Sequence, residues 1–350
     1  MRLPSFEALA EALVGRYTVQ HEIGRGGMAS VYLADDVRHA RQVAIKVMLP
    51  EMAAGLGVER FLREIRLLAR LQHPHILPLY DSGEIAGVLF FVMPYVEGES
   101  LRALLRREGA QTLEHTARIV RHVADALDYA HARGVVHRDL KPENVMLSSG
   151  QALLADFGVA HVGDGGLSDD GGTLTGAATT LGTPAYMSPE QAAGDASLDH
   201  RSDIYSLGCV CFELLSGRPP FAGDNLIAVI GQHLAAPPPP LINTRTPLPA
   251  DVPTGIHRAL AKQPSERFDS AGDLAALLEH AMIASRTPSP ADQRLQHAAA
   301  RDDARARVLV LEFANLTSSR PDAASCWTKG SRCSSARWPS IPRSARPTRG

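Results

Sequence analysis

Hydrophobic and polar residues alternate along the chain up to about residue 96, in the way that favours half-buried β-strands. One stretch departs from this pattern: its apolar residues recur every three or four positions, which predicts a helix over 59–71 that ends before Pro74. The first part of the chain therefore predicts a small antiparallel sheet with one helix. The predicted strands are 17–24, 30–36, 42–49, 76–84 and 88–96.

From Leu101 onward the apolar residues follow the helical period instead. In the stretch 117–134 they share one face, and Gly134 favours a helix end, because glycine tolerates the left-handed conformation that ends many helices. Strands followed by helices indicate an α+β protein with two lobes. We also predict a hairpin over 144–156, a glycine-rich polar stretch over 163–182, a proline-rich surface loop over 235–253 and a closing helix over 270–283.

The composition is that of an ordinary globular protein, and it excludes several classes. The 350 residues suffice for one large domain or two smaller ones, with 45% hydrophobic and 21% charged residues. The net charge of −2 gives no indication of a nucleic-acid partner. No apolar run reaches about 18 residues, and glutamates interrupt the first stretch. We therefore expect no membrane span, no export signal and a cytoplasmic location.

The cysteines and histidines form no disulfide or metal pattern. Four cysteines do not make a disulfide framework in a chain of this length. Cys209 and Cys211 lie in the apolar run IYSLGCVCFELL, which predicts buried thiols rather than a redox or metal pair. His73 and His75 flank a proline and are interpreted as turn residues rather than metal ligands.

The regular pattern weakens after about Ser285. The run RVLVLEFANL at 307–316 is patterned like the first strand of a further domain, but no comparable strand follows. From Pro321 the chain is rich in Arg, Ser and Pro, and our hypothesis is a reading-frame change. An uninterrupted downstream frame extending 307–316 would support it. We expect a helical extension over 1–16, a folded domain over 17–280 (small lobe 17–95, large lobe 96–280), a linker over 281–306, the start of a truncated second domain over 307–320, and a disordered or frame-shifted tail over 321–350.

The stretch HRDLKPEN, residues 137–144, places six polar residues among eight between two apolar runs. So many polar groups are unfavourable in a buried loop unless each is hydrogen-bonded, so the stretch indicates a catalytic or binding site. Asp139 is suited to accept a proton, while Asn144 and the later Asp156 offer oxygen ligands for Mg²⁺. With Lys141 between them, these residues form a set suited to phosphoryl transfer.

HRDLKPEN and the DFG that begins at Asp156 resemble the catalytic and metal-binding loops of eukaryotic-like protein kinases. GRGGMASVYLA and GTPAYMSPEQAAG resemble the bacterial Hanks-type serine/threonine kinases in particular, and the resemblance covers about 17–280. It implies a bilobal fold, with a small antiparallel β-sheet lobe carrying one helix and a larger, mostly helical lobe. It also implies ATP- and Mg²⁺-dependent phosphorylation of protein serine and threonine hydroxyls in bacterial signalling, with Mn²⁺ as an alternative metal.

The resemblance assigns the nucleotide site. Lys46 in VAIK would hold the α- and β-phosphates with Glu64 as its partner, and Ala29 stands where the family has a third glycine. A dinucleotide-binding loop would have to open a helix, whereas SVYLADD continues as a strand. Met93 matches the gatekeeper position, and adenine would meet the Pro94 carbonyl and the Val96 amide. The full predicted set is Ile23, Gly24, Gly26, Val31, Ala44, Lys46, Glu64, Met93, Pro94 and Val96.

Other positions match structural and regulatory residues of the family. Lys141 and Thr183 are typical of serine/threonine rather than tyrosine kinases. Arg138 would receive a phosphate on an autophosphorylated activation-loop threonine; the alternative is that these threonines serve only as turn residues. Glu190 would pair with Arg267, Asp203 would anchor the catalytic loop, and Leu68, Leu79, His137 and Phe157 would form an apolar column. The threonine candidates are Thr173, Thr175, Thr179 and Thr180, of which Thr175 and Thr179 are favoured.

Two alternatives to an active kinase stay open at this point. One is a catalytically weak pseudokinase that acts as a scaffold or binding module, and the other is a non-functional product of a damaged gene. Autophosphorylation of the wild type, compared with Asp139→Asn and Lys46→Ala, distinguishes them from an active enzyme. The expected partners are ATP and protein substrates, with homodimerisation through the small lobe as an expectation of the family.

Overall fold

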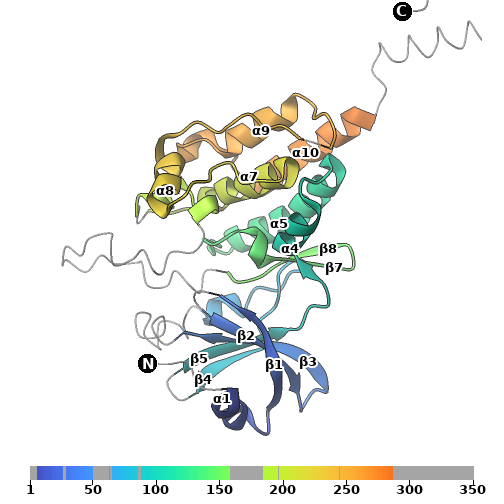
Figure 1. Cartoon of the computed structure of the whole chain (residues 1–350), viewed down its shortest axis with the longest axis vertical. Coiled ribbons are helices and arrows are strands. Elements are labelled where there is room, and N and C mark those ends of the chain that lie inside the picture. The colour runs from blue at the N-terminus through green and yellow to red at the C-terminus, as the bar shows by residue number, and fades with distance from the viewer. Residues whose placement is uncertain are drawn as a thin grey trace, which may run out of the picture. The chain divides into compact units, whose positions relative to one another are not determined.

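In the computed structural model, the N-terminal strands form one five-stranded antiparallel sheet in the order β1-β2-β3-β5-β4 (Figure 1). The period of two in the sequence puts alternate side chains on opposite faces, so that Ile45 and Met48 belong to separate apolar clusters. The strands are β1 (Tyr17–Arg25), β2 (Ala29–Asp36), β3 (Arg41–Met48), β4 (Asp81–Ile85) and β5 (Val88–Pro94).

The structure describes residues 6–26, 29–49, 63, 65–85, 88–157, 184–195, 197–243 and 245–286. The chain divides into two units, Met1–Arg286 and Thr287–Gly350. The second unit lies outside the described residues, and so do the predicted partial domain over 307–320 and the predicted tail over 321–350.

Helical residues contact both faces of the sheet. Helix α1 (Phe6–Leu13) packs Leu9 and Leu13 against the face that includes Ile45. On the other face, Ile65 lies in a helical stretch and packs against Leu89 and Phe91 of β5. Both faces of the sheet therefore carry apolar clusters, which explains why β2, β3 and β5 hold few exposed positions.

The predicted strand over 76–84 is wrong in its first half, because β4 begins only at Asp81. Ile76 instead forms an isolated bridge to Leu154, and the Leu77 amide donates to the Leu154 carbonyl at 2.9 Å. Pro78, in the middle of this half, lacks the N–H that a strand in the sheet would need. The apolar residues of this segment pack where the two lobes meet rather than in the sheet.

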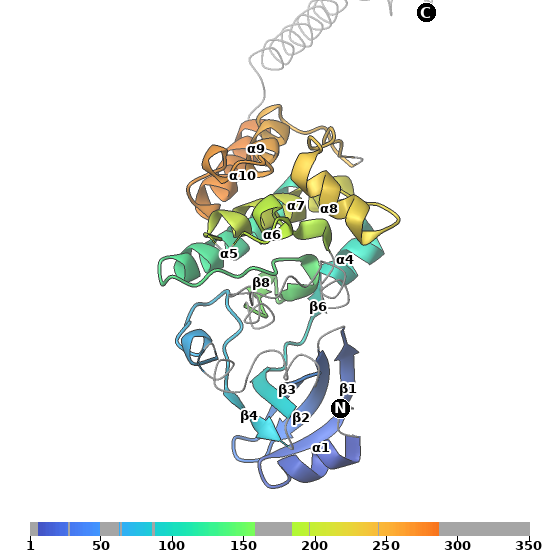
Figure 2. The same ribbon diagram turned by 90° about the vertical axis from the view of Figure 1, so that its left-hand side faces the viewer.

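A second, three-stranded sheet lies between the five-stranded sheet and the helices, in the order β6-β7-β8 (Figure 2). It consists of β6 (Glu99–Ser100), β7 (Val145–Ser148) and β8 (Gln151–Leu154). The β7–β8 turn is the hairpin that the sequence predicts, with Ser149 and Gly150 at φ values of 49° and 77°. This hairpin sets the separation of the two segments that flank it, 137–144 and 155–157.

The remaining elements form a helical lobe with α7 at its centre (Figure 2). Cys209 and Cys211 of α7 are fully buried, as predicted, and burial raises the pKa of both thiols. The helices are α4 (Leu101–Glu108), α5 (Leu113–His131), α6 (Pro189–Ala192), α7 (Arg201–Ser216), α8 (Leu226–Ala235), α9 (Asp251–Ala259) and α10 (Ala271–Arg286), and the short 3₁₀ segments are η1 (Pro142–Asn144), η3 (Pro184–Tyr186) and η4 (Pro264–Glu266).

Helix α5 shows how local signals set the ends of these helices. Thr112 caps its N-terminus by accepting a hydrogen bond from the His115 amide. The helix ends at His131, three residues before Gly134, which has the predicted left-handed conformation at φ 73°. None of the helices in the described ranges is both long and apolar enough to cross a membrane. A sheet lobe joined to a helical lobe confirms the predicted bilobal α+β fold.

Candidate active site

The loop between α5 and β7 brings together the polar residues that stood out in the sequence. The Lys141 ammonium lies 2.7 Å from the Asp139 carboxylate. The Asn144 amide nitrogen donates to the Asp139 carbonyl at 2.8 Å and to its carboxylate at 3.1 Å. Asp139 and Lys141 remain partly exposed, at 23% and 16% of their side chains. Three functional side chains thus share one hydrogen-bonded cluster that still faces solvent.

Asp203 on α7 holds the backbone of this loop in place. Its carboxylate accepts hydrogen bonds from the backbone amides of His137 at 2.7 Å and Arg138 at 2.9 Å, and from the His131 ring at 2.7 Å. Asp203 is only 1% exposed. Burial by itself would raise the pKa of Asp203, but the hydrogen bond and charge of His131 hold it below the ordinary value. A buried carboxylate with three donors is a rigid attachment point.

Lys46 of β3 reaches across to the segment after β8, where it meets Asp156 at 2.7 Å. Burial acts to raise the pKa of Asp156, and the nearby Lys46 ammonium outweighs it, so that the pKa lies below its usual range. The second carboxylate oxygen, Oδ1, is buried and has no hydrogen-bond partner in the described part of the chain. The Ala155 amide donates to the Asn144 carbonyl at 2.8 Å, so Asp156 and Asn144 lie close together.

The predicted nucleotide residues on the sheet are neighbours across the strands. Val31 of β2 pairs with both Gly24 of β1 and Lys46 of β3. Ala44 of β3 pairs with Met93 of β5. Two other predicted members lie on or beside β1: Ile23 is 41% exposed, and the Gly26 amide donates to the Ala29 carbonyl at 2.9 Å. The last two are Pro94, which ends β5, and Val96, two residues later.

An apolar contact links the catalytic loop to the small lobe. The buried ring of His137 lies 4.7 Å from the ring of Phe157, and burial lowers the pKa of His137. Phe157, Leu68 and Leu79 line one small cavity of about 40 Å³ that Met93 also borders. The four residues predicted as a column therefore lie in contact or around one cavity.

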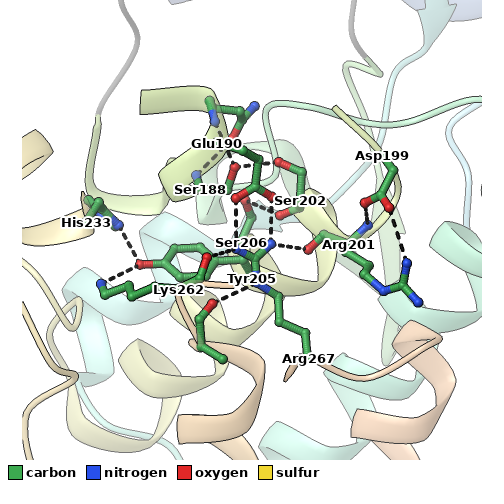
Figure 3. Close-up of polar contacts among 12 residues, drawn as sticks. Ser188, Glu190, Asp199, Arg201, Ser202, Tyr205, Ser206, His233, Lys262 and Arg267 are labelled. Atoms are coloured by element: carbon green, nitrogen blue, oxygen red, sulfur yellow. Dashed lines mark hydrogen bonds and ion pairs between the residues drawn. The ribbon is translucent and has the colours of Figure 1, made fainter. Parts of the chain in front are cut away.

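The predicted Glu190–Arg267 pair is present in the large lobe (Figure 3). The Arg267 guanidinium binds both carboxylate oxygens of Glu190, at 2.6 and 2.8 Å, and is 2% exposed. Its remaining N–H groups donate to three backbone carbonyls, and it lies over the Tyr205 ring at 4.9 Å. These bonds join α6 to the loop before α10.

Several predicted residues lie outside the described part of the chain. They are Glu64, Thr173, Thr175, Thr179, Thr180 and Thr183.

One polar network beside the site is absent from the predictions. Arg102 of α4 donates to Glu143 of the catalytic loop at 2.8 Å and to Glu213 of α7 at 2.6 Å. The Tyr186 hydroxyl binds both Arg102 and Glu213, and burial with the Glu213 charge raises its pKa. Glu213 is a lone charge in the apolar run CVCFELL, which was a usable signal that it has a buried partner.

This fold and the cluster of Lys46, Asp139, Asn144 and Asp156 define the class of the protein. The chain matches the family described as "Protein kinase domain" over residues 17–281 and belongs to that family. Within it, the chain is a bacterial Hanks-type serine/threonine kinase homologue, as its relatives show.

Two curated relatives come from Mycobacterium tuberculosis. The chain is 43% identical over 277 residues to serine/threonine-protein kinase PknD, covering 77% of this chain and 40% of that protein. It is 41% identical over 270 residues to PknB, covering 75% of this chain and 42% of the relative. The match thus spans about two fifths of their length. A crystal structure of a mutant PknI kinase domain from the same species aligns with a TM-score of 0.61 at 34% identity, over 77% of this chain and 96% of that one.

Proposed function

We propose that this chain is an active protein kinase that transfers the γ-phosphate of ATP to serine and threonine hydroxyls of proteins. One observation carries the proposal: Lys46, Asp139, Lys141, Asn144 and Asp156 come from both lobes and form two linked polar clusters. A scaffold protein has no need to keep these groups paired with one another and partly open to solvent.

Asp139 is the residue suited to act on the phosphate acceptor. Its carboxylate is 23% exposed and is held in place by Lys141 and Asn144. A carboxylate in this position can accept the proton of an attacking hydroxyl. The Lys141 ammonium beside it supplies positive charge where negative charge develops on the transferred group. The strained backbone before Asp139, with Arg138 at φ 65°, fixes the direction of its side chain.

The residues fit a divalent metal. One carboxylate oxygen of Asp156 is buried and has no hydrogen-bond partner among the described residues, while the other binds Lys46. A buried anionic oxygen without a donor suits a cation. Asn144 lies close to Asp156, because the amide of Ala155, the residue before Asp156, donates to the Asn144 carbonyl. We assign Mg²⁺ to these two residues, with Mn²⁺ as the alternative. The bound metal supplies charge neutralisation on the phosphates.

Lys46 and the strand residues around it are suited to hold the nucleotide. Lys46 lies on β3 beside Val31, and Ala44 lies opposite Met93, so the adenine side and the phosphate side of the site share one strand. Pro94 lacks only its N–H and can still offer a carbonyl. The glycines at 24 and 26 allow the backbone to approach phosphates without a side chain in the way.

The proposal includes control by autophosphorylation. Arg138 directly precedes Asp139, its side chain is exposed, and no ion pair holds it among the residues that the structure describes. The Arg138 guanidinium could therefore bind a phosphate on Thr173, Thr175, Thr179 or Thr180. The proposal also includes action on bacterial signalling proteins in the cytoplasm, where ATP is available, and homodimerisation through the small lobe.

The test is ATP-dependent autophosphorylation and substrate phosphorylation by the purified chain, with Mg²⁺, with Mn²⁺ and with EDTA. Asp139→Asn and Lys46→Ala should lose activity, whereas Asp199→Asn, at an exposed carboxylate that pairs with the nearby Arg201, should keep it. A wild type no more active than Asp139→Asn would refute the proposal in favour of a scaffold or an inactive product. Mass spectrometry of the active protein then shows whether the loop threonines carry phosphate.

A further inference from the structure

The residue before Asp139 has a backbone conformation that needs outside support. Arg138 lies at φ 65°, in the left-handed region that non-glycine residues rarely adopt. Such a conformation persists only where the surrounding structure holds it. The peptide that leaves Arg138 leads directly into Asp139, so whatever holds it also fixes the direction of the Asp139 side chain.

Two side chains hold the Arg138 backbone from opposite sides. The Arg138 N–H donates to the Asp203 carboxylate at 2.9 Å. The Arg138 carbonyl accepts a hydrogen bond from the Gln191 side-chain amide at 2.6 Å. The first contact comes from α7 and the second from α6. The second holds the carbonyl of the peptide group that Arg138 shares with Asp139, and the N–H of that peptide donates to the His137 ring at 3.2 Å.

The Gln191 amide is itself locked in place by a second set of bonds. Its oxygen accepts from the Ser188 backbone N–H at 3.0 Å, while the Gln191 backbone N–H donates to the Ser188 hydroxyl at 3.2 Å. This reciprocal arrangement is a capping box at the start of α6. The oxygen is used by the cap, and the nitrogen is therefore turned toward the catalytic loop. A single amide does both tasks.

The cap is tied to the same helix that supplies Asp203. The buried Ser188 and Ser202 hydroxyls lie 2.6 Å apart (Figure 3). Ser202 directly precedes Asp203 on α7. The two contacts to Arg138 therefore start from adjacent residues, one directly through Asp203 and the other through Ser202, Ser188 and Gln191.

We propose that Gln191 is a positioning residue for phosphoryl transfer: its amide N–H holds the Arg138–Asp139 peptide and thereby aims the Asp139 carboxylate. The inference rests on the proposed kinase function. Gln191 does not touch the reacting groups, so its loss should affect the rate of the chemical step rather than nucleotide binding. Misplacement of a reacting group by about 1 Å is enough for a large loss of rate.

Gln191→Glu separates the two tasks of the side chain. Glutamate keeps an oxygen for the Ser188 N–H, and it suits the first turn of a helix, so the cap and the fold should remain. It has no N–H for the Arg138 carbonyl. Gln232→Glu is a matched control, because Gln232 also donates to a backbone carbonyl, that of Ala222 at 2.9 Å, but lies on α8. Gln191→Ala removes both the side-chain half of the cap, which is the acceptor for the Ser188 N–H, and the contact to Arg138.

The full chain is assayed at saturating and limiting ATP. We expect Gln191→Glu to lower kcat by about tenfold to a hundredfold, with KM for ATP within about twofold and an unchanged Tm. Gln232→Glu should match the wild type. Hydrogen exchange of the amides of 138–140 should speed up in Gln191→Glu by about tenfold and stay unchanged in Gln232→Glu.

The outcomes distinguish the two proposals. An active wild type with Gln191→Glu at the same kcat overturns the role of Gln191 and leaves the kinase function standing. Gln191→Glu could instead lose kcat together with as much Tm as Gln191→Ala loses. That result would assign Gln191 a stabilising role only and would also overturn its positioning role. A wild type as inactive as Asp139→Asn refutes the kinase function. In that case hydrogen exchange alone tests whether Gln191 holds the Arg138–Asp139 peptide, and unchanged exchange in Gln191→Glu overturns the inference.

Discussion

Lys46 and Asp156 form an ion pair with 2.7 Å between nitrogen and oxygen, although Lys46 lies on β3 of the small lobe and Asp156 follows β8 of the large lobe. Both side chains are about one fifth exposed, at 19% and 24%. The other carboxylate oxygen of Asp156 is buried, and none of the residues that the structure describes donates to it. The charge of Lys46 therefore bears on the proposed nucleotide site and on the proposed metal ligand together.

Lys46→Met tests that double role. Methionine keeps much of the apolar stem and removes the charge, so phosphate transfer should fall by about 100-fold or more. The pKa of Asp156 should rise, because its main attraction is lost while its burial stays. The measurement is the initial rate of phosphorylation with radiolabelled ATP. Retention of activity within a few fold of the wild type would rule out a role for this charge.

Asp203→Asn should weaken the catalytic loop without changing the shape of its anchor. Asparagine is neutral and offers one acceptor oxygen in place of two, so one of the two backbone N–H groups of His137 and Arg138 is left without an acceptor and the other loses a charged one. The expected loss is about 2–3 kcal/mol in the free energy of unfolding. Urea unfolding measures it. Asp199→Asn, on an exposed loop, is the control, and an equal effect in both variants would contradict the anchoring role.

The protein should lose stability as the pH falls from 7 to 5. Burial lowers the pKa of His233 to about 4, and it also lowers that of His137. A histidine whose pKa in the folded protein lies below its unfolded value, about 6.5, makes unfolding more favourable as the pH drops below that value, because the unfolded chain takes up the proton first. His233 alone accounts for about 2 kcal/mol at pH 5.

His233→Gln checks the assignment of this pH effect. Glutamine can accept the hydrogen bond that the Tyr205 hydroxyl makes to His233 Nδ1 at 2.9 Å, but it does not titrate. Urea unfolding of the variant should therefore show a smaller difference between pH 7 and pH 5 than the wild type shows. An identical difference in both proteins would place the acid sensitivity elsewhere.

Arg267→Ala should be the most destabilising change in the large lobe. It leaves the Glu190 carboxylate without its partner and removes bonds to three backbone carbonyls. The expected loss is about 3–5 kcal/mol, since removing one member of a buried ion pair leaves an uncompensated charge. Chemical denaturation measures the loss. Glu190→Gln, which keeps an acceptor for Arg267, should be milder, and the reverse order would contradict this account.

Local patterns account for much of the fold. The strands of the small lobe and helix α5 were predictable because each buries one or both faces, and the buried face shows in the sequence as apolar residues at a regular spacing. The run 76–80 was not, because its apolar side chains pack between lobes and carry no period of a strand. Propensity alone gives no sign of which neighbour covers an apolar residue.

The same division holds for the candidate site. HRDLKPEN and DFG indicated Asp139, Asn144 and Asp156 because charged and amide groups are rare between apolar runs. Gln191 was not indicated in this way, since a glutamine after SPE looks like any solvent-facing helix residue until its amide is seen 2.6 Å from the Arg138 carbonyl.

The sequence by itself determined the class of fold, the family and the residue types that the chemistry requires, because periodicity and motif spacing are properties of neighbouring residues. Only the tertiary structure decided which oxygen of Asp156 binds Lys46, how Asp203 and Gln191 hold the two sides of Arg138, and where the run 76–80 packs. These are contacts between distant segments, and their geometry depends on how whole elements pack rather than on any local pattern.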